Sequence, residues 1–378
     1  MHNLDLQEIR LKLDQIDKNI TALFEERMKL CGDVAAFKIQ TGKAVYDGER
    51  EKQKLEAVRG LAHGSFNQQA VTELFSQMMT ISRRYQYQLL GEQGRIPSSG
   101  FECVEKLNRE NARVVYQGTE GAYSHGAALK YFGEDARVYH VPTWEEAMKE
   151  VDENRADYAV LPIENSSAGA VSDIYDLLVQ YNNYIVGEVF LEVNHVLLGL
   201  PGSRIDQIRT VYSHPQALMQ SSQYLNANKN WRQVSVANTA MAAKKILEDG
   251  DKTQAAVASE TAGRLYSLIP LKTGINHNKN NTTRFIIVTN RPVYQEGAKK
   301  ISICFELPHK SGSLYNMLGN FIFNNVNMVM IESRPILGRN WEYRFFVDIE
   351  GTLSSAPVQN ALMGIGQEAA GLRILGNY

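Results

Sequence analysis

The chain has 378 residues, of which 44% are hydrophobic and 22% are charged, and 40 Lys+Arg against 42 Asp+Glu give a net charge of −2. This composition is typical of a soluble globular protein with two to three domains, and it offers no positive field that would favour nucleic acid or a membrane surface as a partner. We expect neither a signal peptide nor a membrane span, and the widely spaced Cys31, Cys103 and Cys304 argue against a disulfide framework or a zinc site. A cytoplasmic location fits these features best.

An amphipathic pattern opens the chain. Apolar residues at alternating steps of three and four predict one long helix from Leu4 to about Gln40. Arg27 and Lys38 fall on the same apolar stripe, eleven residues or about 16 Å apart along the axis. Burying two cations is costly unless something pairs them, so the pattern favours a ligand with more than one carboxylate or phosphate. The alternative is that both side chains reach solvent or pair with neighbouring glutamates.

Arg10 adds a geometric constraint. It lies seventeen residues before Arg27, about 25 Å away along the axis, so it cannot reach the same small ligand from its own chain. If it serves this site, it must come from an antiparallel partner helix. The predicted helix is also too long to be covered by the protein in its own neighbourhood. We therefore expect a homodimer or a higher homo-oligomer.

Two further helices are predicted before residue 90. Asp47 stands at the N-cap position of the second helix, with Arg50 and Glu51 in its first turn. Ser82 interrupts the apolar stripe of the third helix, and Gln86 follows one turn later. Each has an ordinary interpretation: a capped, solvated first turn for the acidic group, and for Ser82 a hydroxyl bonded back to its own helix. Together, they place a set of polar groups near the two cations.

The order of these residues resembles the all-α, AroQ-type chorismate mutase, an intertwined helical dimer. The resemblance covers residues 4–90 and rests on Arg10, Arg27, Lys38, Asp47-x-x-Arg50-Glu51 and Ser82-x-x-x-Gln86. It implies a mutase domain over residues 1–90 with chorismate as its substrate. It also implies a role for each residue: Arg27 and the partner subunit's Arg10 hold the two carboxylates, Lys38 and Gln86 are catalytic at the ether oxygen, Asp47 and Glu51 contact the ring hydroxyl, and Arg50 and Ser82 complete the wall.

The chemistry of such a site agrees with the residues present. A Claisen rearrangement needs neither a nucleophile nor a proton shuttle. It needs the substrate held in a folded conformation and the negative charge that grows on the ether oxygen stabilised. A pocket of fixed cations and amides, without a Cys–His or Ser–His pair, suits that reaction.

Residues 91–111 have the composition of a linker. Beyond them, strand and helix patterns alternate over residues 112–292, which predicts parallel sheets with ligands at the carboxyl ends of the strands. Several strand ends are rich in Ser, Thr, Asn and Gly; singly these are ordinary caps, and as a set they suit a small carboxylate ligand held between two lobes. His125 and His214 are possible acid–base groups, although each stands where a Ser-His turn would occur anyway.

Four motifs in this region resemble prephenate dehydratase: Gly118-x-x-Gly121-x-Tyr123-Ser124, Pro162-Ile-Glu-Asn-Ser-Ser, Tyr212-Ser-His-Pro-Gln and Thr283-Arg284-Phe285. The resemblance implies two α/β lobes around a cleft, similar to a type II periplasmic binding protein, that convert prephenate to phenylpyruvate. The ring hydroxyl leaves poorly without a proton or hydrogen-bond donor, and the family gives that role to Thr283 rather than Thr282. The remaining cleft residues that it implies are Glu164, Asn165, Ser166, Ser213, His214, Phe285 and Arg284, the last either holding a carboxylate or staying structural.

Residues 299–378 read as βαββαβ, a ferredoxin-like order. With Glu332-Ser333-Arg334-Pro335 they resemble the ACT regulatory domain of prephenate dehydratases, which implies L-phenylalanine as an effector. The second effector segment, Gly312, Ser313 and Leu314 followed by Tyr315, departs from the usual Gly-Ala-Leu-Val, which puts the strength of this feedback in question.

The leading hypothesis is a multidomain α and α+β enzyme of phenylalanine biosynthesis, similar to the P-protein family, with both activities and no metal or organic cofactor. A mutase fused to a prephenate dehydrogenase would require a nucleotide-binding fingerprint after an early strand, where this chain has Gly-x-x-Gly instead. The remaining alternative is a non-catalytic, two-lobed sensor of small carboxylates fused to a mutase.

Overall fold

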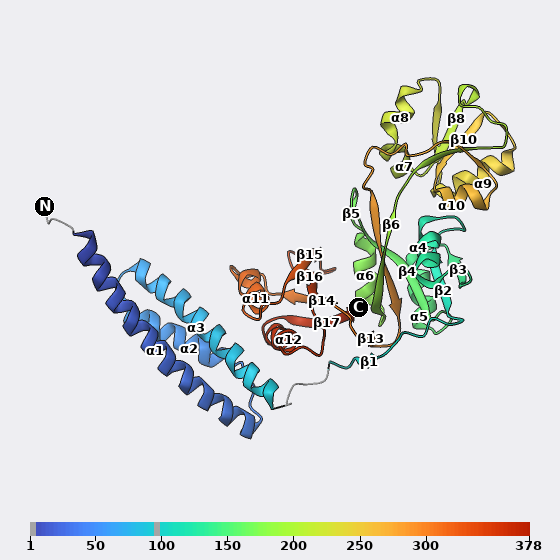
Figure 1. Ribbon diagram of the computed structural model, residues 1–378. Helices are drawn as coiled ribbons and strands as arrows, with labels where there is room; N and C mark the ends of the chain where they lie inside the picture. The colour runs from blue at the N-terminus through green and yellow to red at the C-terminus, as the bar shows by residue number, and fades with distance from the viewer. Residues whose placement is uncertain (1–4, 94–98) are drawn as a thin grey trace. The chain divides into compact units, whose positions relative to one another are not determined.

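The computed structural model describes residues 5–93 and 99–378, shown in Figure 1. The predicted helix start at Leu4 and residues 94–98 of the predicted linker lie outside this described part of the chain. The chain divides into two compact units, Met1–Ser99 with Cys304–Arg373 and Gly100–Ile303 with Ile374–Tyr378. None of the helices in residues 5–93 and 99–378 is long and apolar enough to cross a membrane.

The first unit begins with the three predicted helices, α1 (Leu6–Thr41), α2 (Gly48–Leu61) and α3 (Ser65–Glu92). Asp5 caps α1 by accepting a hydrogen bond from the backbone N–H of Gln7, and Asp47 caps α2 through the N–H of Arg50. The C-cap of α1 is Gly42, whose φ of 72° is a left-handed conformation that favours glycine. The predicted N-cap position of Asp47 is thus confirmed.

The N-terminal half of the α1 stripe lies open in the single chain. Leu13, Ile16 and Leu23 expose 52%, 51% and 65% of their surface, whereas Ala35 and Ile39 near the end of the helix are buried. The sequence predicts a core-facing stripe, yet within one chain only its C-terminal part packs against a neighbouring element. A contiguous apolar surface of this kind on a globular protein is typical of an interface.

The C-terminal segment, most of which belongs to the first unit, has the predicted βαββαβ order. Its strands lie side by side in the order β15-β16-β14-β17, so the predicted ferredoxin-like topology is confirmed. Within the first unit, α12 packs against both α11 and α3. The bounds are β14 (Lys300–Leu307), α11 (Ser313–Ile322), β15 (Met328–Pro335), β16 (Tyr343–Glu350), α12 (Ala356–Glu368) and β17 (Ala370–Asn377).

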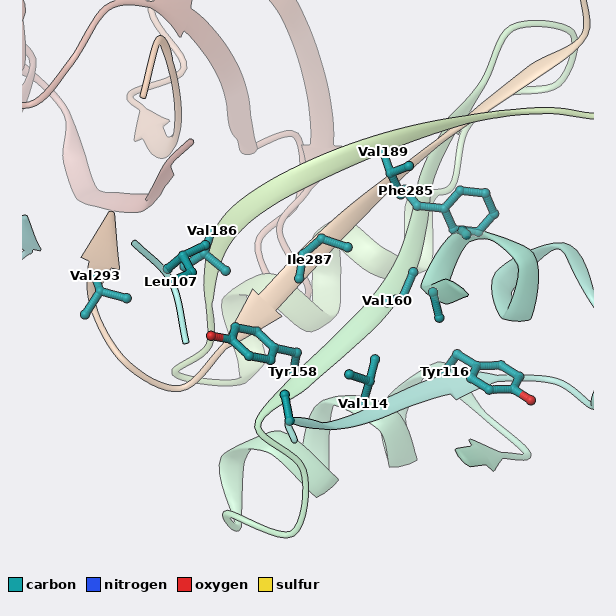
Figure 2. Close-up of a cluster of buried hydrophobic side chains, with 13 residues drawn as sticks. Leu107, Val114, Tyr116, Tyr158, Val160, Val186, Val189, Phe285, Ile287 and Val293 are labelled. Atoms are coloured by element: carbon teal, nitrogen blue, oxygen red, sulfur yellow. The ribbon is translucent and has the colours of Figure 1, made fainter. Parts of the chain in front are cut away.

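The second unit has two lobes, each built on one sheet. The strands of the first lobe lie in the order β6-β12-β4-β2-β3. Its elements are β2 (Arg113–Gln117), α4 (Tyr123–Phe132), β3 (Arg137–Val141), α5 (Trp144–Asp152), β4 (Tyr158–Asn165), β5 (Gly169–Ala170), α6 (Ser172–Gln180), β6 (Tyr184–Glu192) and β12 (Thr282–Thr289). Figure 2 shows the apolar core beneath this sheet, where Tyr116, Tyr158, Phe285 and Ile287 are almost completely buried.

The strands of the second lobe lie in the order β11-β7-β10-β8-β9. Its elements are β7 (Val196–Gly199), the 3-10 helix η1 (Ile205–Gln207), β8 (Thr210–Ser213), α7 (Pro215–Gln220), α8 (Ser222–Ala227), β9 (Arg232–Ser235), α9 (Thr239–Asp249), β10 (Gln254–Ala258), α10 (Glu260–Leu265) and β11 (Ile269–Lys272). Small residues such as Ala240, Ala243 and Ala256 are completely buried between α9 and the sheet. This close packing fixes the helix N-termini that face the other lobe.

Both sheets are mixed rather than parallel, which differs from the prediction. β2 runs parallel to β3 and β4, and β8 runs parallel to β9 and β10, as expected from the alternating pattern. However, β12 is antiparallel to both β4 and β6, and β7 is antiparallel to β10 and β11. The reason is topological: β7 and β12 are the first strands after the chain crosses from one lobe to the other, and each runs against its neighbours, whereas β6 runs in the same direction as β4.

The predicted linker contains a short strand that its composition did not indicate. β1 (Glu102–Val104) pairs in parallel with β13 (Val293–Gln295). Leu107, three residues later, is 4% exposed and belongs to the core of the first lobe. This stretch therefore anchors the start of the second unit.

Two candidate active sites

Arg27 and Ser82 meet between α1 and α3. The guanidinium Nη1 of Arg27 lies 2.5 Å from Ser82 Oγ and 3.3 Å from the carbonyl oxygen of Met78. The Ser82 hydroxyl in turn donates to the same Met78 carbonyl at 2.7 Å, so it does bond back to its own helix. The hydroxyl of Ser82 is therefore bonded to its own helix and also holds the half-buried Arg27 against α3.

Lys38 lies at the C-terminal end of α1, close to the start of α2. Its ammonium donates to the carbonyl oxygen of Val45 at 2.6 Å. Burial lowers the pKa of Lys38 from its ordinary value of 10.5, and the nearby carboxylates of Asp47 and Glu51 oppose that shift. The electrostatics thus place one partly desolvated cation beside two acidic groups.

Gln86 is buried on the same face of α3 as Ser82. It is 6% exposed, and its Nε2 donates to the backbone carbonyl of Ser82 at 3.2 Å. Its Oε1 is also buried and has no hydrogen-bond partner among the described residues. A buried polar atom without a partner is uncommon, and rotation of the amide about its last bond would place an N–H donor at that point instead.

The other predicted residues of this site are less enclosed. Asp47 and Arg50 are exposed, and they interact through the carboxylate of Asp47 and the backbone N–H of Arg50 at 3.0 Å. Arg10 is exposed near the other end of α1, consistent with the distance along the helix axis. Within one chain, Arg27 contacts Ser82, and Lys38 lies near Asp47 and Glu51, whereas Arg10 is exposed near the start of α1.

Sequence reasoning missed Arg83, which binds Glu51. Its Nη1 lies 2.6 and 2.5 Å from the two carboxylate oxygens of Glu51. The only signal in the sequence was that Arg83 directly follows Ser82 on α3, and an arginine there is ordinarily a solvated surface residue. Here only 12% of its side chain is exposed.

A cavity of about 410 Å³ lies between the two lobes of the second unit. One side consists of the ends of β4 and β12 and the start of α4; the other consists of the starts of α7 and α9. Four predicted residues line it: Asn165, His214, Thr283 and Phe285. Its wall is largely apolar, with Trp144, Pro162, Val171 and Val193 among its members.

Asn165 orients the hydroxyl of Thr283. The Oδ1 of Asn165 accepts the backbone N–H groups of Ser167 and Ala168 at 3.0 and 2.9 Å, which fixes the orientation of its amide. Its Nδ2 must then donate to Thr283 Oγ1, 2.9 Å away. Because the Thr283 oxygen accepts this hydrogen bond from Asn165, the O–H of Thr283 can donate its own proton to a different acceptor. The arrangement provides a neutral donor at the wall of the cavity.

A chain of hydrogen bonds continues from Asn165 across the cleft. Its Nδ2 also donates to Asn281 Oδ1 at 2.8 Å, and Asn281 Nδ2 donates to Gln220 Oε1 at 3.3 Å. The same Gln220 oxygen lies 2.9 Å from His195 Nε2, and His195 Nδ1 lies 3.0 Å from the Tyr123 hydroxyl. Burial lowers the pKa of His195, so the ring is neutral and passes one donor and one acceptor along the chain.

Sequence reasoning missed Asn281, Gln220 and His195. They stand on segments far apart in sequence, and no local spacing joins them. His195 is 2% exposed and follows a strand, where a histidine is ordinarily part of the core. Tyr123 was part of a recognised motif without an assigned role.

Four predicted cleft residues make other contacts. Arg284 is buried and donates to Glu188 at 2.7 Å and to the Tyr378 hydroxyl at 2.8 Å, with Glu164 at 3.9 Å. The hydroxyl of Ser213 donates to the Val257 carbonyl at 2.6 Å, and that of Ser166 donates to the Asn280 carbonyl at 3.2 Å. These contacts favour the structural alternative for Arg284, because side chains alternate along β12 and Arg284 points away from Thr283 and Phe285.

The two histidines singled out in the sequence also differ. His214 is the N-cap of α7 and accepts the backbone N–H of Gln216 at 3.2 Å, while its ring lines the 410 Å³ cavity. His125 accepts the N–H of Gly121 at 3.1 Å and lines a neighbouring cavity. Burial lowers the pKa of both rings, so each is a poor proton donor near neutral pH.

Strand β16 lies beside both predicted effector segments. A cavity of about 130 Å³ is lined by Ser313, Leu314, Tyr343 and Phe345. In the pairing of β15 with β16, Ser333 lies opposite Phe345, and Pro335 lies opposite Tyr343. The Glu332–Pro335 segment thus borders the strand that lines this cavity, and Gly312 has a φ of 81° at the turn into α11.

Comparison with known families assigns a class to each site. Residues 9–87 match the model of "Chorismate mutase type II", and residues 114–293 match that of "Prephenate dehydratase". The three-helix site and the two-lobed cavity therefore belong to an enzyme that carries both catalytic domains on one chain.

Relatives along the whole chain identify the family. A bifunctional chorismate mutase/prephenate dehydratase of Buchnera aphidicola subsp. Schizaphis graminum is 33% identical and covers 99% of this chain and 96% of its own. The protein of the same description from Escherichia coli K12 is 32% identical, with 99% and 96% covered. The chain belongs to the family of bifunctional chorismate mutase/prephenate dehydratases.

Two solved structures share the fold of the larger part of this chain. A prephenate dehydratase from Arthrobacter aurescens, in complex with L-Phe, is 29% identical with a TM-score of 0.65, over 70% of this chain and 89% of that one. GqqA, described as a novel type of quorum quenching acylase, is 33% identical with a TM-score of 0.65, over 70% of this chain and 97% of that one.

Proposed function

We propose that the two reactions occur at two separate sites. The helical domain, residues 1–90, rearranges chorismate to prephenate. Residues 91–111, of which 102–107 fold with the second unit, lead to the dehydratase domain, residues 112–292, where prephenate becomes phenylpyruvate. Residues 299–378 form an ACT-type regulatory domain. The free thiols Cys31, Cys103 and Cys304 suit a reducing cytoplasm.

In the mutase site, the substrate is a dianion and the cations bind it. Arg27, fixed by Ser82, holds one carboxylate, and Arg10 of the partner subunit holds the other. Lys38 and the amide of Gln86 face the ether oxygen, where negative charge grows in the transition state. The place of Gln86 supports this role, because its amide is buried on the face of α3 that also carries Ser82, the residue that holds Arg27. Asp47, Arg50 and Glu51 enclose the hydroxyl end of the ring.

A dimer completes this site. The open apolar stripe of α1 supports it, because pairing with an antiparallel copy would cover Leu13, Ile16 and Leu23 and would bring a second Arg10 toward Arg27. The stripe and the arginine lie on one helix, so a single association would meet both needs.

The pH dependence of the mutase follows from Lys38. Burial lowers the pKa of Lys38 below 10.5, so the ammonium loses its proton at a lower pH than a free lysine does. The mutase kcat/KM, which reports the free enzyme, should therefore fall on the alkaline side before pH 10.5 is reached, and the decline should be absent in Lys38→Arg. Initial rates between pH 6 and pH 10.5 test this. A wild-type rate that stays constant over the whole range would contradict it.

In the dehydratase site, decarboxylation and loss of the ring hydroxyl occur together. The electron pair of the breaking carbon–carbon bond enters the ring as carbon dioxide leaves, and the hydroxyl departs with its bonding electron pair and takes a proton from solvent to form water. Thr283 supplies the hydrogen bond at that oxygen, and its orientation by Asn165 is the observation that carries this assignment. The apolar wall around Trp144 and Phe285 disfavours a solvated carboxylate and favours its loss as carbon dioxide.

We further propose L-phenylalanine as the effector. The 130 Å³ cavity beside Ser313 and Leu314 supports this, together with the pairing that brings Ser333 and Pro335 to its border. The Arthrobacter aurescens relative is described as a complex with L-Phe. Tyr315 and Ser313 replace smaller apolar residues of the usual segment, and the Tyr315 hydroxyl accepts a hydrogen bond from Gln77 Nε2 at 3.3 Å.

The decisive experiment incubates the pure full chain with chorismate and follows phenylpyruvate, with and without L-phenylalanine. We expect phenylpyruvate to accumulate without added metal or cofactor, and L-phenylalanine to slow it. If the middle region were a non-catalytic sensor of small carboxylates, chorismate would stop at prephenate while prephenate still bound. That outcome would refute the dehydratase assignment and leave the mutase assignment standing.

A further inference from the structure

The last turn of helix α12, in the C-terminal segment, is hydrogen-bonded to the N-terminal helical domain. The side-chain oxygen of Gln367 accepts the backbone N–H of Tyr46 at 3.0 Å. The same oxygen accepts the hydroxyl of Tyr87, which is 3% exposed on α3. One amide thus joins the loop before α2, helix α3 and α12.

Arg83 lies next to this contact and is shared between two carboxylates. Its Nη1 binds both oxygens of Glu51 at 2.6 and 2.5 Å, and its Nη2 binds Glu368 Oε1 at 2.7 Å. The exposed fractions of the three side chains are 12% for Arg83, 24% for Glu51 and 15% for Glu368. Thr80 accepts a further hydrogen bond from Nη2 at 3.0 Å, and the guanidinium lies over the ring of Tyr46 at 5.4 Å.

In this cluster, the cation Arg83 binds two anions, Glu51 and Glu368. A guanidinium can satisfy two carboxylates at once because its donors form a rigid fork, whereas a lysine in the same place would act as a point charge. Burial raises the pKa of Glu368, and Arg83 opposes that shift. Arg83 thus hydrogen-bonds both carboxylates, and Lys38 is a further cation near Glu51.

We propose that Arg83 is a positioning residue of the mutase site, which fixes the carboxylate of Glu51 and is itself fixed by Glu368 of the C-terminal domain. The inference rests on the proposed mutase site, in which Glu51 contacts the ring hydroxyl. It assigns to α12 a role in the first reaction, although α12 stands 285 residues away in sequence.

The surroundings of this group connect it to the effector segment. A cavity of about 210 Å³ adjoins it and is lined by Glu51, Arg83 and Glu368 together with Ser313 and Asn316 of α11. Ser313 belongs to the predicted phenylalanine segment. A change in the packing of α11 would thus act on the same carboxylates that hold Arg83.

The test uses the full chain with Glu368→Gln, which keeps the size of the side chain and removes its charge. A neutral amide is a weaker acceptor, so Arg83 and then Glu51 are held less firmly. We expect the KM for chorismate to rise about threefold to tenfold with kcat within about twofold, because substrate binding rather than charge on the ether oxygen is affected. Dehydration of supplied prephenate should not change. Arg83→Lys should have the same effect and provides a second variant if Glu368→Gln does not fold.

Two comparisons separate positioning from a structural role. Glu350→Gln removes the same charge from β16, where Glu350 accepts a hydrogen bond from Asn327 at 3.0 Å, and should leave both activities unchanged. In a Glu51→Gln background, Glu368→Gln should have no further effect on KM, because the group it acts through is gone. An unchanged KM in Glu368→Gln, or an equal effect with and without Glu51, would overturn the proposal. A wild-type chain without mutase activity would instead refute the site on which it rests.

Discussion

Thr283→Ala should lower the kcat of prephenate dehydration by about 10²- to 10⁴-fold, the usual contribution of a positioned proton donor. The methyl group of alanine cannot hydrogen-bond the leaving hydroxyl, and the donated N–H of Asn165 loses its acceptor at 2.9 Å. Thr283 is 9% exposed and small, so the loss of a few atoms should leave the fold intact. Phenylpyruvate formation from supplied prephenate is the measurement.

Two variants control for this effect. Thr283→Ser keeps the hydroxyl and should retain activity within about tenfold. Thr282→Ala changes the neighbouring threonine, whose side chain is only half-buried and outside the residues that line the cavity, and should behave as wild type. Mutase activity should be the same in all three. A Thr283→Ala enzyme that still forms phenylpyruvate at the wild-type rate would exclude this residue as the donor.

Lys38→Ala should reduce mutase kcat by about 10²- to 10³-fold, the range found when one electrostatic donor is removed from a preorganised site. The ammonium lies near the acidic groups at the start of α2, and alanine leaves the ether oxygen without this cation. The rate of prephenate formation from chorismate is the measurement. Dehydration of supplied prephenate should be preserved, because Thr283 and its cavity belong to the other unit of the chain.

The matched control is Lys43→Ala. Lys43 lies five residues after Lys38, its ammonium lies over the ring of Phe37, and its removal should not affect the mutase.

A second comparison tests the shared site. Arg10→Ala and Lys38→Ala chains, each inactive alone, should regain part of the mutase activity when refolded together, because a mixed dimer contains one intact site. Absence of recovery would contradict a mutase site shared between two subunits. Loss of both activities in a well-folded Lys38→Ala chain would contradict two independent sites.

Local patterns predicted the elements of this chain well. The three-and-four spacing of apolar residues predicted α1, and Asp47 marked the start of α2, because periodicity and capping act within a few residues. The βαββαβ order of the C-terminal segment followed in the same way. The direction of β12 did not, since strand pairing is decided by segments that are distant in sequence.

The sites were predictable only where the residues carry a recognisable motif. Thr283, Asn165 and His214 line the cleft as the resemblance implied. Arg284 follows Thr283 in sequence but lies on the opposite face of the strand, because consecutive side chains alternate. Arg83 was missed because its second partner, Glu368, comes from another domain, and His195, Gln220 and Asn281 were missed because three separate segments bring them together.

The exposed apolar stripe on α1 has a consequence for how the two activities depend on the concentration of the protein. The cavity around Thr283 is lined by residues of one chain, whereas the proposed mutase site takes Arg10 from a second copy. By mass action, dilution would deplete the first activity while sparing the second. Cellular protein level would then set not only the total flux but also the ratio of the two catalytic capacities.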